Sequence, residues 1–344
     1  MSHFWDEIAE QPEVAARLLG RSRDAVAQIG ARIREAQPRG YVIAARGSSD
    51  HAALYAKYLL GVRNRALVAL AAPSLFTHYA SPPNLEDQCV IGISQSGASP
   101  DVISVIEEAR RQGALTIAIS NDAASPLATV AELVLPLEAG PERSVPASKT
   151  YTASLLALAL ISQAVNPDEG FGAALSRVPH AMASALEMDS ELEKLVPLLT
   201  GTRAIVLGRG FNFSTAEELA LKLMETSYVM ARAWSVADFE HGPIAVLEAG
   251  LSVVVVDGGG AVATQMRSIR ERVGAKGCHV LQLVDGELGD VDRSAAVGLR
   301  SGLPEELTPI SLAVLAQLLA HHVAVARGFD PDSPREIRKV TRTW

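Results

Sequence analysis

The sequence predicts an α/β fold made of two similar halves, each with a doubly wound parallel sheet. Three observations lead to this prediction. Short apolar runs, typical of buried strands, alternate with amphipathic segments along most of the 344 residues. Several of these runs end in a glycine- or serine-rich turn that leads into a helix, as in parallel sheets. The same succession of elements occurs twice, with a period of about half the chain, which indicates that one unit is duplicated.

The first half begins with an N-terminal helical segment over residues 1–36, where apolar residues recur at helical spacing. A first α/β subdomain is predicted over 37–166, and a helix over 151–165 closes it. Its expected strands lie at 41–45, 66–71, 89–93, 115–120 and 133–137. A mostly helical connector over 167–199 then leads into the second half.

The second half is predicted as a second α/β subdomain over 200–330, followed by a C-terminal tail over 331–344. A helix should follow the glycine turn at 208–210, with Ser214 and Glu217 forming a capping box at its start. Another apolar helix is expected at 312–325. The expected strands lie at 204–207, 251–256 and 280–284.

Composition and charge narrow the possible classes of protein. The net charge of −8 argues against a nucleic-acid-binding surface, which needs a basic patch. Cys89 and Cys278 lie in or beside apolar runs, so we expect two buried thiols in a reduced, cytoplasmic protein. No apolar signal segment stands in the first 20 residues, and the apolar stretch 155–165 is too short to span a bilayer. No ligand spacing suggests a metal, and no cofactor is expected.

Residues 89–101 form the most informative stretch of the chain. An apolar run leads into a turn with three hydroxyls, Ser94, Ser96 and Ser99, and a helix should begin at Pro100. The free N–H groups and positive end of a helix favour an anion, and hydroxyls beside them add neutral donors. The turn therefore predicts a phosphate site, although a serine-rich turn that merely caps its helix remains the alternative.

Two known motifs fail to match this turn. A nucleophile elbow needs glycine where Ser96 stands, and a P-loop needs a lysine after Gly97. A similar turn, Arg46-Gly47-Ser48-Ser49, follows the first predicted strand. Both turns follow strands of one parallel sheet, so we expect them to converge at its carboxyl edge. The second half has no Ser-x-Ser-Gly counterpart, which places the predicted anion site in the first half only.

The helix after Ser214 carries charged residues at offsets of four and three, Glu218, Lys222 and Glu225. These spacings put all three on one helix face. The face is either a solvated ion pair or an acid/base group with a tuning lysine. His241 precedes Gly-Pro in a predicted turn, and is either a catalytic histidine or a structural one.

These motifs, taken together, resemble the double-SIS sugar isomerases. They occur in the family's order over about residues 40–344 and comprise Gly47–Ser49, Ser94–Gly97, Val145–Thr150, Leu207–Gly210, Glu218–Glu225, Glu240–Pro243 and Pro334–Lys339. The chain looks like the isomerase part of glucosamine-6-phosphate synthase and like stand-alone glucosamine-6-phosphate deaminases. The resemblance implies two tandem SIS subdomains of flavodoxin-like topology.

The resemblance also implies roles for individual residues. The phosphate-binding set would be Ser49, Ser94, Gln95, Ser96 and Ser99, and the sugar-binding set Gly47, Ser48, Val145 and Ser148. Glu225 matches the base that moves a proton between carbons 1 and 2, with Lys222 and Glu218 beside it. His241 matches the ring-opening group, often supplied by the partner in a homodimer with shared active sites. Lys339 matches the tail lysine that reaches the open sugar.

The sequence also departs from the synthase pattern. No glutaminase domain is expected in this chain, and Ala98, Pro100 and Met224 replace residues that are usual in the family. We therefore expect deamination of glucosamine 6-phosphate to fructose 6-phosphate and ammonia. The alternatives are a deglycase that acts on a sugar-phosphate amine adduct and a non-catalytic sensor of sugar phosphates. A sensor would need only the serines, without the charged helix and the histidine.

Overall fold

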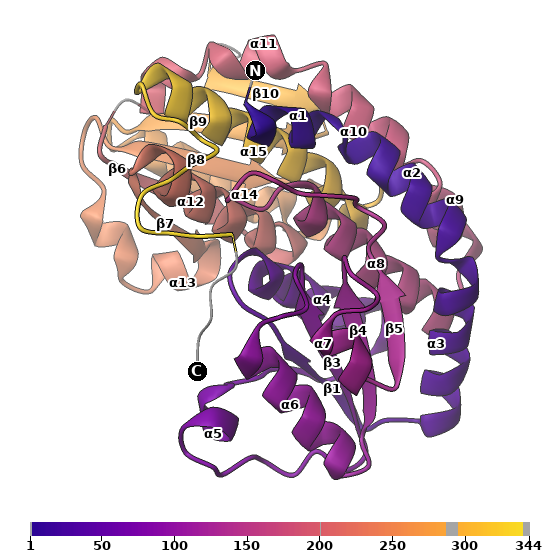
Figure 1. Cartoon of the computed structure of the whole chain (residues 1–344). Coiled ribbons are helices and arrows are strands. Elements are labelled where there is room, and N and C mark those ends of the chain that lie inside the picture. Colours follow the sequence, from indigo (N-terminus) through magenta and orange to yellow (C-terminus); the bar gives the residue numbers. More distant parts are fainter. Residues whose placement is uncertain (1, 200, 287–294, 340–344) are drawn as a thin grey trace. The chain divides into compact units, whose positions relative to one another are not determined.

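The computed structural model describes residues 2–199, 201–286 and 295–339. Figure 1 shows its helices and strands with their labels. The end of the predicted tail, 340–344, and residue 200 lie outside the described residues. The chain forms two compact units that are described separately. The β1–β5 unit comprises 13–142, 149–176 and 337–344, and the β6–β10 unit comprises 1–12, 143–148 and 177–336.

The β1–β5 unit contains a five-stranded parallel sheet in the order β2-β1-β3-β4-β5. Its strands are β1 (Gly40–Ala44), β2 (Val68–Leu70), β3 (Gln88–Ser94), β4 (Leu115–Ser120) and β5 (Leu133–Pro136). β3 and β4 form its centre because their side chains are apolar and buried on both faces, as is usual for strands of a doubly wound sheet.

Helices cover both faces of this sheet. One apolar cluster joins the sheet to α6 (Pro100–Arg111) and α7 (Pro126–Val130) through residues such as Val90, Val105 and Leu127. A second group packs together from α3 (Arg23–Ala36), α4 (Ser48–Asn64) and α8 (Lys149–Val165). The remaining helices of this part of the chain are α2 (Gln11–Arg21), α5 (Ser74–Thr77) and α9 (Glu169–Leu175).

The β6–β10 unit repeats this topology, with the strand order β10-β9-β8-β6-β7, again all parallel. Its strands are β6 (Arg203–Gly208), β7 (Met230–Ser235), β8 (Ser252–Asp257), β9 (His279–Asp285) and β10 (Ala296–Leu299). Read from its β7 edge, the order β7-β6-β8-β9-β10 corresponds strand by strand to β2-β1-β3-β4-β5 in the first sheet. The predicted duplication of one doubly wound unit is therefore confirmed.

Two long helices dominate the β6–β10 unit, α12 (Phe213–Ser227) and α15 (Thr308–Ala326), and they pack against each other. Around them lie α1 (His3–Ala9), α10 (Val178–Leu186), α11 (Asp189–Glu193), α13 (Val236–Glu240) and α14 (Ala263–Gly274). Short 3₁₀ turns complete the unit: η1 (Val196–Leu199), η2 (Gly210–Asn212), η3 (Pro243–Val246), η4 (Gly260–Val262) and η6 (Glu305–Leu307).

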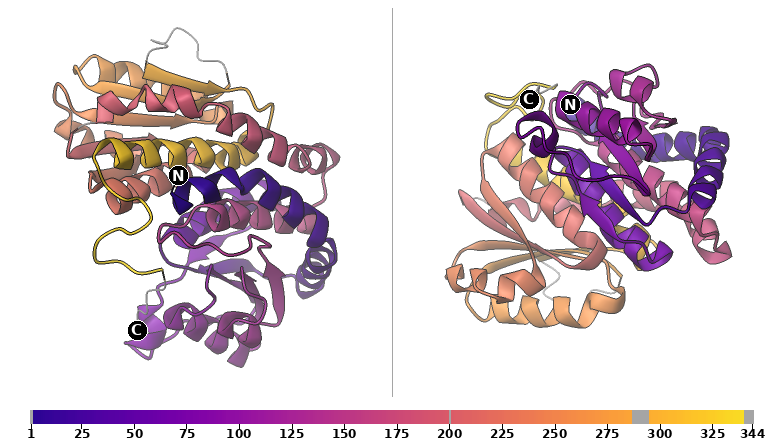
Figure 2. Two further views of the ribbon diagram at one scale, coloured as in Figure 1. Left: turned by 45° about the horizontal axis from the view of Figure 1, so that its top comes forward. Right: turned by 90° about the horizontal axis from the view of Figure 1, so that it is seen from below.

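The segment Glu305–Ala326, which contains α15, is long and apolar enough to cross a membrane by length and composition. Most of it is nevertheless buried inside the structure, 78% of its most apolar window. Figure 2 shows α15, in yellow, lying along the β6–β10 sheet. Its apolar character is therefore that of a core helix in a globular protein. Both cysteines are free thiols, with Cys89 buried and Cys278 half-buried.

Several element boundaries differ from those predicted. β7 and β10 were not predicted, and β2 is shorter than the strand expected at 66–71. The capping box at Ser214 is wrong. Asn212 precedes the first residue of α12, so Ser214 lies inside the first turn and donates to the carbonyl of Phe211 at 2.8 Å.

Candidate functional site

The two serine-rich turns lie at the topological switch point of the β1–β5 sheet. β1 and β3 are neighbours in the sheet, with Ala44 opposite Gly92. The strand order reverses between them, because β1 leads through α4 to β2 on one side and β3 leads through α6 to β4 on the other. Gly47–Ser49 follows β1, and Gln95–Ser99 follows β3. Ligands of doubly wound sheets bind at such switch points, outside the carboxyl ends of the strands. The predicted convergence of these two turns is consistent with this topology.

The turn between β3 and α6 gathers its hydroxyls through local hydrogen bonds. Ser94 Oγ accepts the Gly97 N–H at 3.1 Å and lies 3.2 Å from Ser99 Oγ, while Ser96 Oγ accepts the Ala98 N–H at 3.2 Å. Ser99 precedes α6 without bonding to its N–H groups through its side chain. The start of α6 therefore combines three hydroxyls with the positive end of a helix.

Gly97 lets this turn pack closely against the segment that leads into α7. Its φ of +59° is left-handed, and a Cβ at this position would lie 2.1 Å from Ser125 Oγ. The Gly97 carbonyl accepts the Leu127 N–H at 2.9 Å, and the Gln95 carbonyl accepts the Asn121 N–H at 3.3 Å. Bonds to the chain after β4 thus fix the shape of the turn in advance of any ligand.

An ion pair that the sequence analysis missed connects the two serine turns. Arg46 Nε donates to Asp101 Oδ2 at 2.6 Å, and the Asp101 side chain is only 1% exposed. Arg46 directly precedes Gly47, and Asp101 lies in the first turn of α6. Burial raises the pKa of the nearby Asp50 carboxyl, and the charges of His51 and Arg46 act in the opposite direction. The only signal in the sequence was the charge beside each turn.

In the β6–β10 unit, α12 carries the predicted acid/base group on a buried face. Lys222 Nζ lies 2.6 Å from Glu225 Oε2 and 3.5 Å from Glu218 Oε1. The side chains of Lys222 and Glu218 are 0% exposed, whereas that of Glu225 is 22% exposed. The face is therefore not a solvated one. Glu225 is the member that can meet a solute, and the buried Lys222 ammonium group holds it in position.

His241 lies in the turn after α13, as predicted, and its side chain is exposed. Its backbone N–H donates to the Asp238 carbonyl at 3.1 Å, and Gly242 turns the chain into η3 with a φ of +143°. Within the described part of the chain its imidazole makes no hydrogen bond. A histidine presented in this way is free to meet a ligand or a second protein chain.

The residues predicted to line the sugar occupy ordered backbone. Gly47 adopts a left-handed φ of +56°, and Ser48 begins α4. The Val145 N–H donates to the Asp332 carbonyl at 3.1 Å, and the carbonyl of the buried Ser148 accepts from Gln317 Nε2 at 3.2 Å.

The tail lysine, Lys339, has a partner that the sequence analysis did not single out. Its Nζ lies 2.6 Å from Oε2 of Glu142, whose side chain is fully buried. Glu142 stands three residues before Val145. That position beside a predicted ligand segment was the only available signal.

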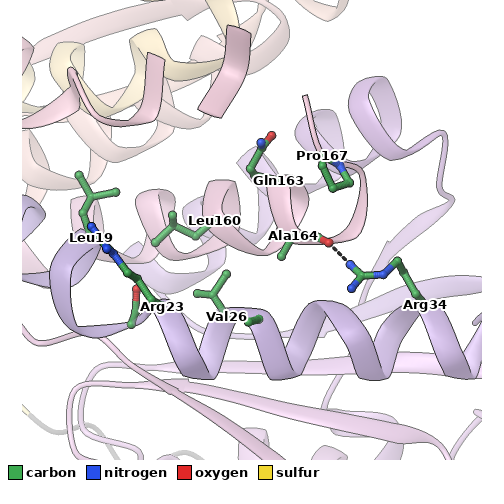
Figure 3. Close-up of a pocket in the computed structure, with 10 residues that line it drawn as sticks. Leu19, Arg23, Val26, Arg34, Leu160, Gln163, Ala164 and Pro167 are labelled. Carbon is green, nitrogen blue, oxygen red and sulfur yellow. Dashed lines mark hydrogen bonds between the residues drawn. The ribbon is translucent and has the colours of Figure 1, made fainter. Parts of the chain in front are cut away.

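The described residues include an apolar pocket but no group of metal ligands. No group of three or more histidine, cysteine, aspartate or glutamate side chains there could hold a metal ion. An apolar pocket of about 410 Å³ lies between α3 and α8 (Figure 3), with Arg34 donating to the Ala164 carbonyl at its edge. None of the predicted site residues lines it.

Comparison with known proteins identifies the class of protein. The SIS domain family matches the chain twice, at residues 36–163 and 198–327. The chain therefore belongs to the SIS family of sugar-phosphate isomerases, with two tandem copies of the domain. The resemblance found in the sequence is confirmed.

Individual relatives give a finer comparison. The glutamine–fructose-6-phosphate aminotransferase of Thermococcus kodakarensis is 34% identical over 98% of this chain, which spans only 57% of that relative. A protein of Silicibacter pomeroyi DSS-3, named provisionally as a phosphosugar isomerase, is 34% identical with a TM-score of 0.88, over 96% of this chain and 100% of its own. The glucosamine-6-phosphate deaminase of Thermotoga maritima shares the fold, with a TM-score of 0.79 at 22% identity over 99% and 100% of the two chains.

Proposed function

We propose that this protein deaminates glucosamine 6-phosphate to fructose 6-phosphate and ammonia through an aldose–ketose proton transfer. The observation that carries the proposal is the pairing of Glu225, partly exposed, with the fully buried Lys222 at 2.6 Å. An aldose–ketose shift needs one carboxylate that takes and returns a proton within reach of both carbons. A protein that only sensed a sugar phosphate would have no use for this pair.

In the proposed reaction, His241 assists opening of the sugar ring, because an imidazole can donate and accept protons near neutral pH. Glu225 then takes the proton from carbon 2 and returns it to carbon 1, while a proton passes from the amine nitrogen to the oxygen on carbon 1. The amine at carbon 2 thereby becomes an imine. Water adds to this imine, and ammonia leaves to give the ketose. Lys222, with Glu218 behind it, holds Glu225 in place through both transfers.

The substrate phosphate would be held by Ser49, Ser94, Gln95, Ser96 and Ser99, at the positive end of α6. The sugar would lie against Gly47, Ser48, Val145 and Ser148, with Lys339 meeting its open form. Neutral donors suit this purpose because they bind a phosphate without a metal ion.

Deamination is the proposed net direction because water is its only co-reactant. Synthesis from fructose 6-phosphate would require free ammonia, which at neutral pH is mostly ammonium and therefore a poor nucleophile. High ammonium concentrations should reverse the reaction. We propose a cytoplasmic setting, where hexose phosphates are metabolised.

A panel of hexosamine 6-phosphates and sugar-phosphate amine adducts, assayed for released ammonia or amine, tests the proposal. Glucosamine 6-phosphate should be turned over fastest. Preferred release of an amine from an adduct would indicate a deglycase, and binding without any turnover would indicate a sensor. Either result would replace the proposed reaction.

Glu225→Gln tests the role of the base, because it keeps the size of the side chain and removes the proton acceptor. We expect turnover to fall by about 10²–10⁴ with substrate binding retained. The matched control is Glu191→Gln, which removes the acid of an exposed pair with Lys194 at the same spacing and distance, 2.6 Å. Normal exchange of the carbon-2 proton with deuterium in Glu225→Gln would show that another group is the base.

We further propose a homodimer in which His241 serves the active site of the partner subunit. This fits an exposed imidazole that has no hydrogen bond within the described part of its own chain. Inactive Glu225→Gln and His241→Asn chains, mixed under subunit exchange, should regain part of the activity, because one site of each mixed dimer carries neither defect. Proven exchange without recovery would place His241 in its own chain's site.

A further inference from the structure

The ammonium group of Lys339 is held by one fully buried acid. Nζ of Lys339 lies 2.6 Å from Oε2 of Glu142, and the exposed fractions of the two side chains are 23% and 0%. Both residues belong to the β1–β5 unit. A buried carboxylate is costly unless it is paired and hydrogen-bonded, so loss of this contact should cost more than loss of a surface ion pair.

Glu142 is itself fixed by the start of α8. Its Oε1 accepts the Thr150 N–H at 3.1 Å, and its Oε2 accepts from Thr150 Oγ1 at 2.9 Å. Thr150 is the second residue of α8, so the carboxylate lies at the positive end of that helix. Bonds to an ionised acceptor are short and directional, and they leave Glu142 little freedom to move. Lys339 thus pairs with an immobile partner.

A second contact fixes the tail four residues earlier, within the β6–β10 unit. The Arg335 N–H donates to Tyr228 Oη at 2.9 Å, and the Arg335 guanidinium lies 4.5 Å from the centre of the Tyr228 ring. Tyr228 ends α12 and stands three residues after Glu225. The tail is therefore attached at Arg335 and again at Lys339.

We infer that Glu142 is the positioning residue of Lys339: its carboxylate fixes the ammonium group of the tail at the start of α8. The inference rests on the proposed function, in which Lys339 meets the open sugar. Glu142 does not itself touch the substrate. Fixing a reacting group in advance removes an entropic cost, and a displacement of about 1 Å can lower a rate by about 10².

The first test needs no substrate. Trace acetylation with acetic anhydride, read by mass spectrometry, reports how accessible and reactive the Lys339 amino group is. Glu142→Gln keeps an oxygen that can accept from Thr150 but removes the charge, so we expect Lys339 to be acetylated several-fold faster. Glu138→Gln is the matched control, because Glu138 lies four residues earlier and pairs with Arg21 at the surface, at 3.1 Å. It should leave the acetylation of Lys339 unchanged.

The second test uses turnover of the proposed substrate. Glu142→Gln should lower kcat by about 10–10² with little change in KM, because the phosphate site is untouched. Glu142→Asp should fall between the parent and Glu142→Gln, since it keeps the charge but moves it away by one methylene. This variant also serves if Glu142→Gln does not fold, which thermal unfolding will show.

The outcomes separate this inference from the proposed function. Unchanged acetylation of Lys339 in the Glu142 variants overturns the inference, and so does unchanged kcat in an active enzyme. A parent protein that turns over no sugar phosphate overturns the proposed function instead. In that case the acetylation result still decides whether Glu142 holds Lys339.

Discussion

In the predicted phosphate turn, Ser94–Ser99, the hydroxyl of Ser96 makes a single hydrogen bond within the described part of the fold. Its Oγ accepts the Ala98 N–H, whereas Ser94 is buried and bonded to Gly97. Ser96→Ala should therefore keep the turn and lose a donor to a charged group, a bond of about 1.5–3 kcal/mol. We expect calorimetry to show sugar-phosphate affinity reduced about tenfold or more.

A matched control is Ser104→Ala on α6, where the hydroxyl donates to the Asp101 carbonyl at 2.8 Å. This variant should bind sugar phosphates as tightly as the parent does. Equal affinity for Ser96→Ala and the parent would remove Ser96 from the phosphate site.

His321 on α15 should make the protein sensitive to mild acid. Burial, helped by the charge of His322, lowers its pKa to about 4, against the opposing charges of Asp189 and Asp332. The unfolded chain takes up this proton near the ordinary histidine pKa of about 6.5, before the folded protein does. Stability must therefore fall as the pH drops from about 6.5 to about 4.

His321→Phe should flatten this part of the pH dependence, because the ring is kept and the proton site is removed. The measurement is the urea midpoint of unfolding at pH 7 and at pH 4.5 for parent and variant. A variant whose midpoint falls as steeply as that of the parent would assign the acid sensitivity to other groups.

At the level of elements, the β3–α6 turn depends on one glycine. Gly97→Ala would combine a left-handed φ of +59° with a Cβ 2.1 Å from Ser125 Oγ. We expect a loss of more than about 2 kcal/mol in stability together with loss of sugar-phosphate binding. Thermal unfolding and calorimetry measure the two effects.

Gly113→Ala is the control for the backbone effect alone. Gly113 follows the same helix with a φ of +82°, and nothing lies within 4 Å of the added Cβ. It should cost about 1 kcal/mol and leave binding intact. If Gly97→Ala behaved in the same way, the close contact with Ser125 would be irrelevant to the site.

The elements that could be predicted from sequence are those with a strong local pattern. The buried strands β3, β4 and β8 are continuous apolar runs, and glycine or serine turns follow them. β7 was missed because it is an edge strand that starts three residues after α12, with Met230 and Arg232 exposed. Buried and exposed residues alternate along β7, but the strand is too short and too polar for this period to be recognised in the sequence.

The site residues that could be predicted are likewise those with a local sequence pattern. The spacing of Glu218, Lys222 and Glu225 gave their common face, but their burial depends on the packing of α12 against α15, nearly 100 residues away. Glu142 and the pair Arg46–Asp101 were missed because such partners are joined by the fold and have no fixed spacing. The roles of these residues stay predictions until they are tested.

At the level of the whole molecule, two sheets of one topology differ in how their corresponding turns are filled. In the second sheet, the turn after β8 receives a carboxylate from the chain itself: Glu305 Oε2 accepts the Ala261 N–H at 2.6 Å. Ala261 lies in η4, directly before α14. Glu305 thus occupies a position at the start of this helix where an anion could otherwise bind.

Glu305→Ala should therefore expose an anion site in the second half. We expect it to cost about 0.5–2 kcal/mol, as loss of a helix-capping group does. Added sulfate should restore part of that loss, because it can accept the freed N–H. Thermal unfolding of parent and variant over a sulfate series measures this, with sodium chloride at equal ionic strength as the control. Equal gains for both proteins would contradict the prediction.

The turn after β8 also couples two positions that are distant in the sequence, Gly260 and Glu305. A Cβ at Gly260 would lie 1.9 Å from Glu305 Oε2, so a larger residue at 260 would have to displace this carboxylate. In the β6–β10 unit this turn therefore carries an internal carboxylate together with a glycine at 260. Descendants of this lineage should keep or lose Gly260 and Glu305 as a pair.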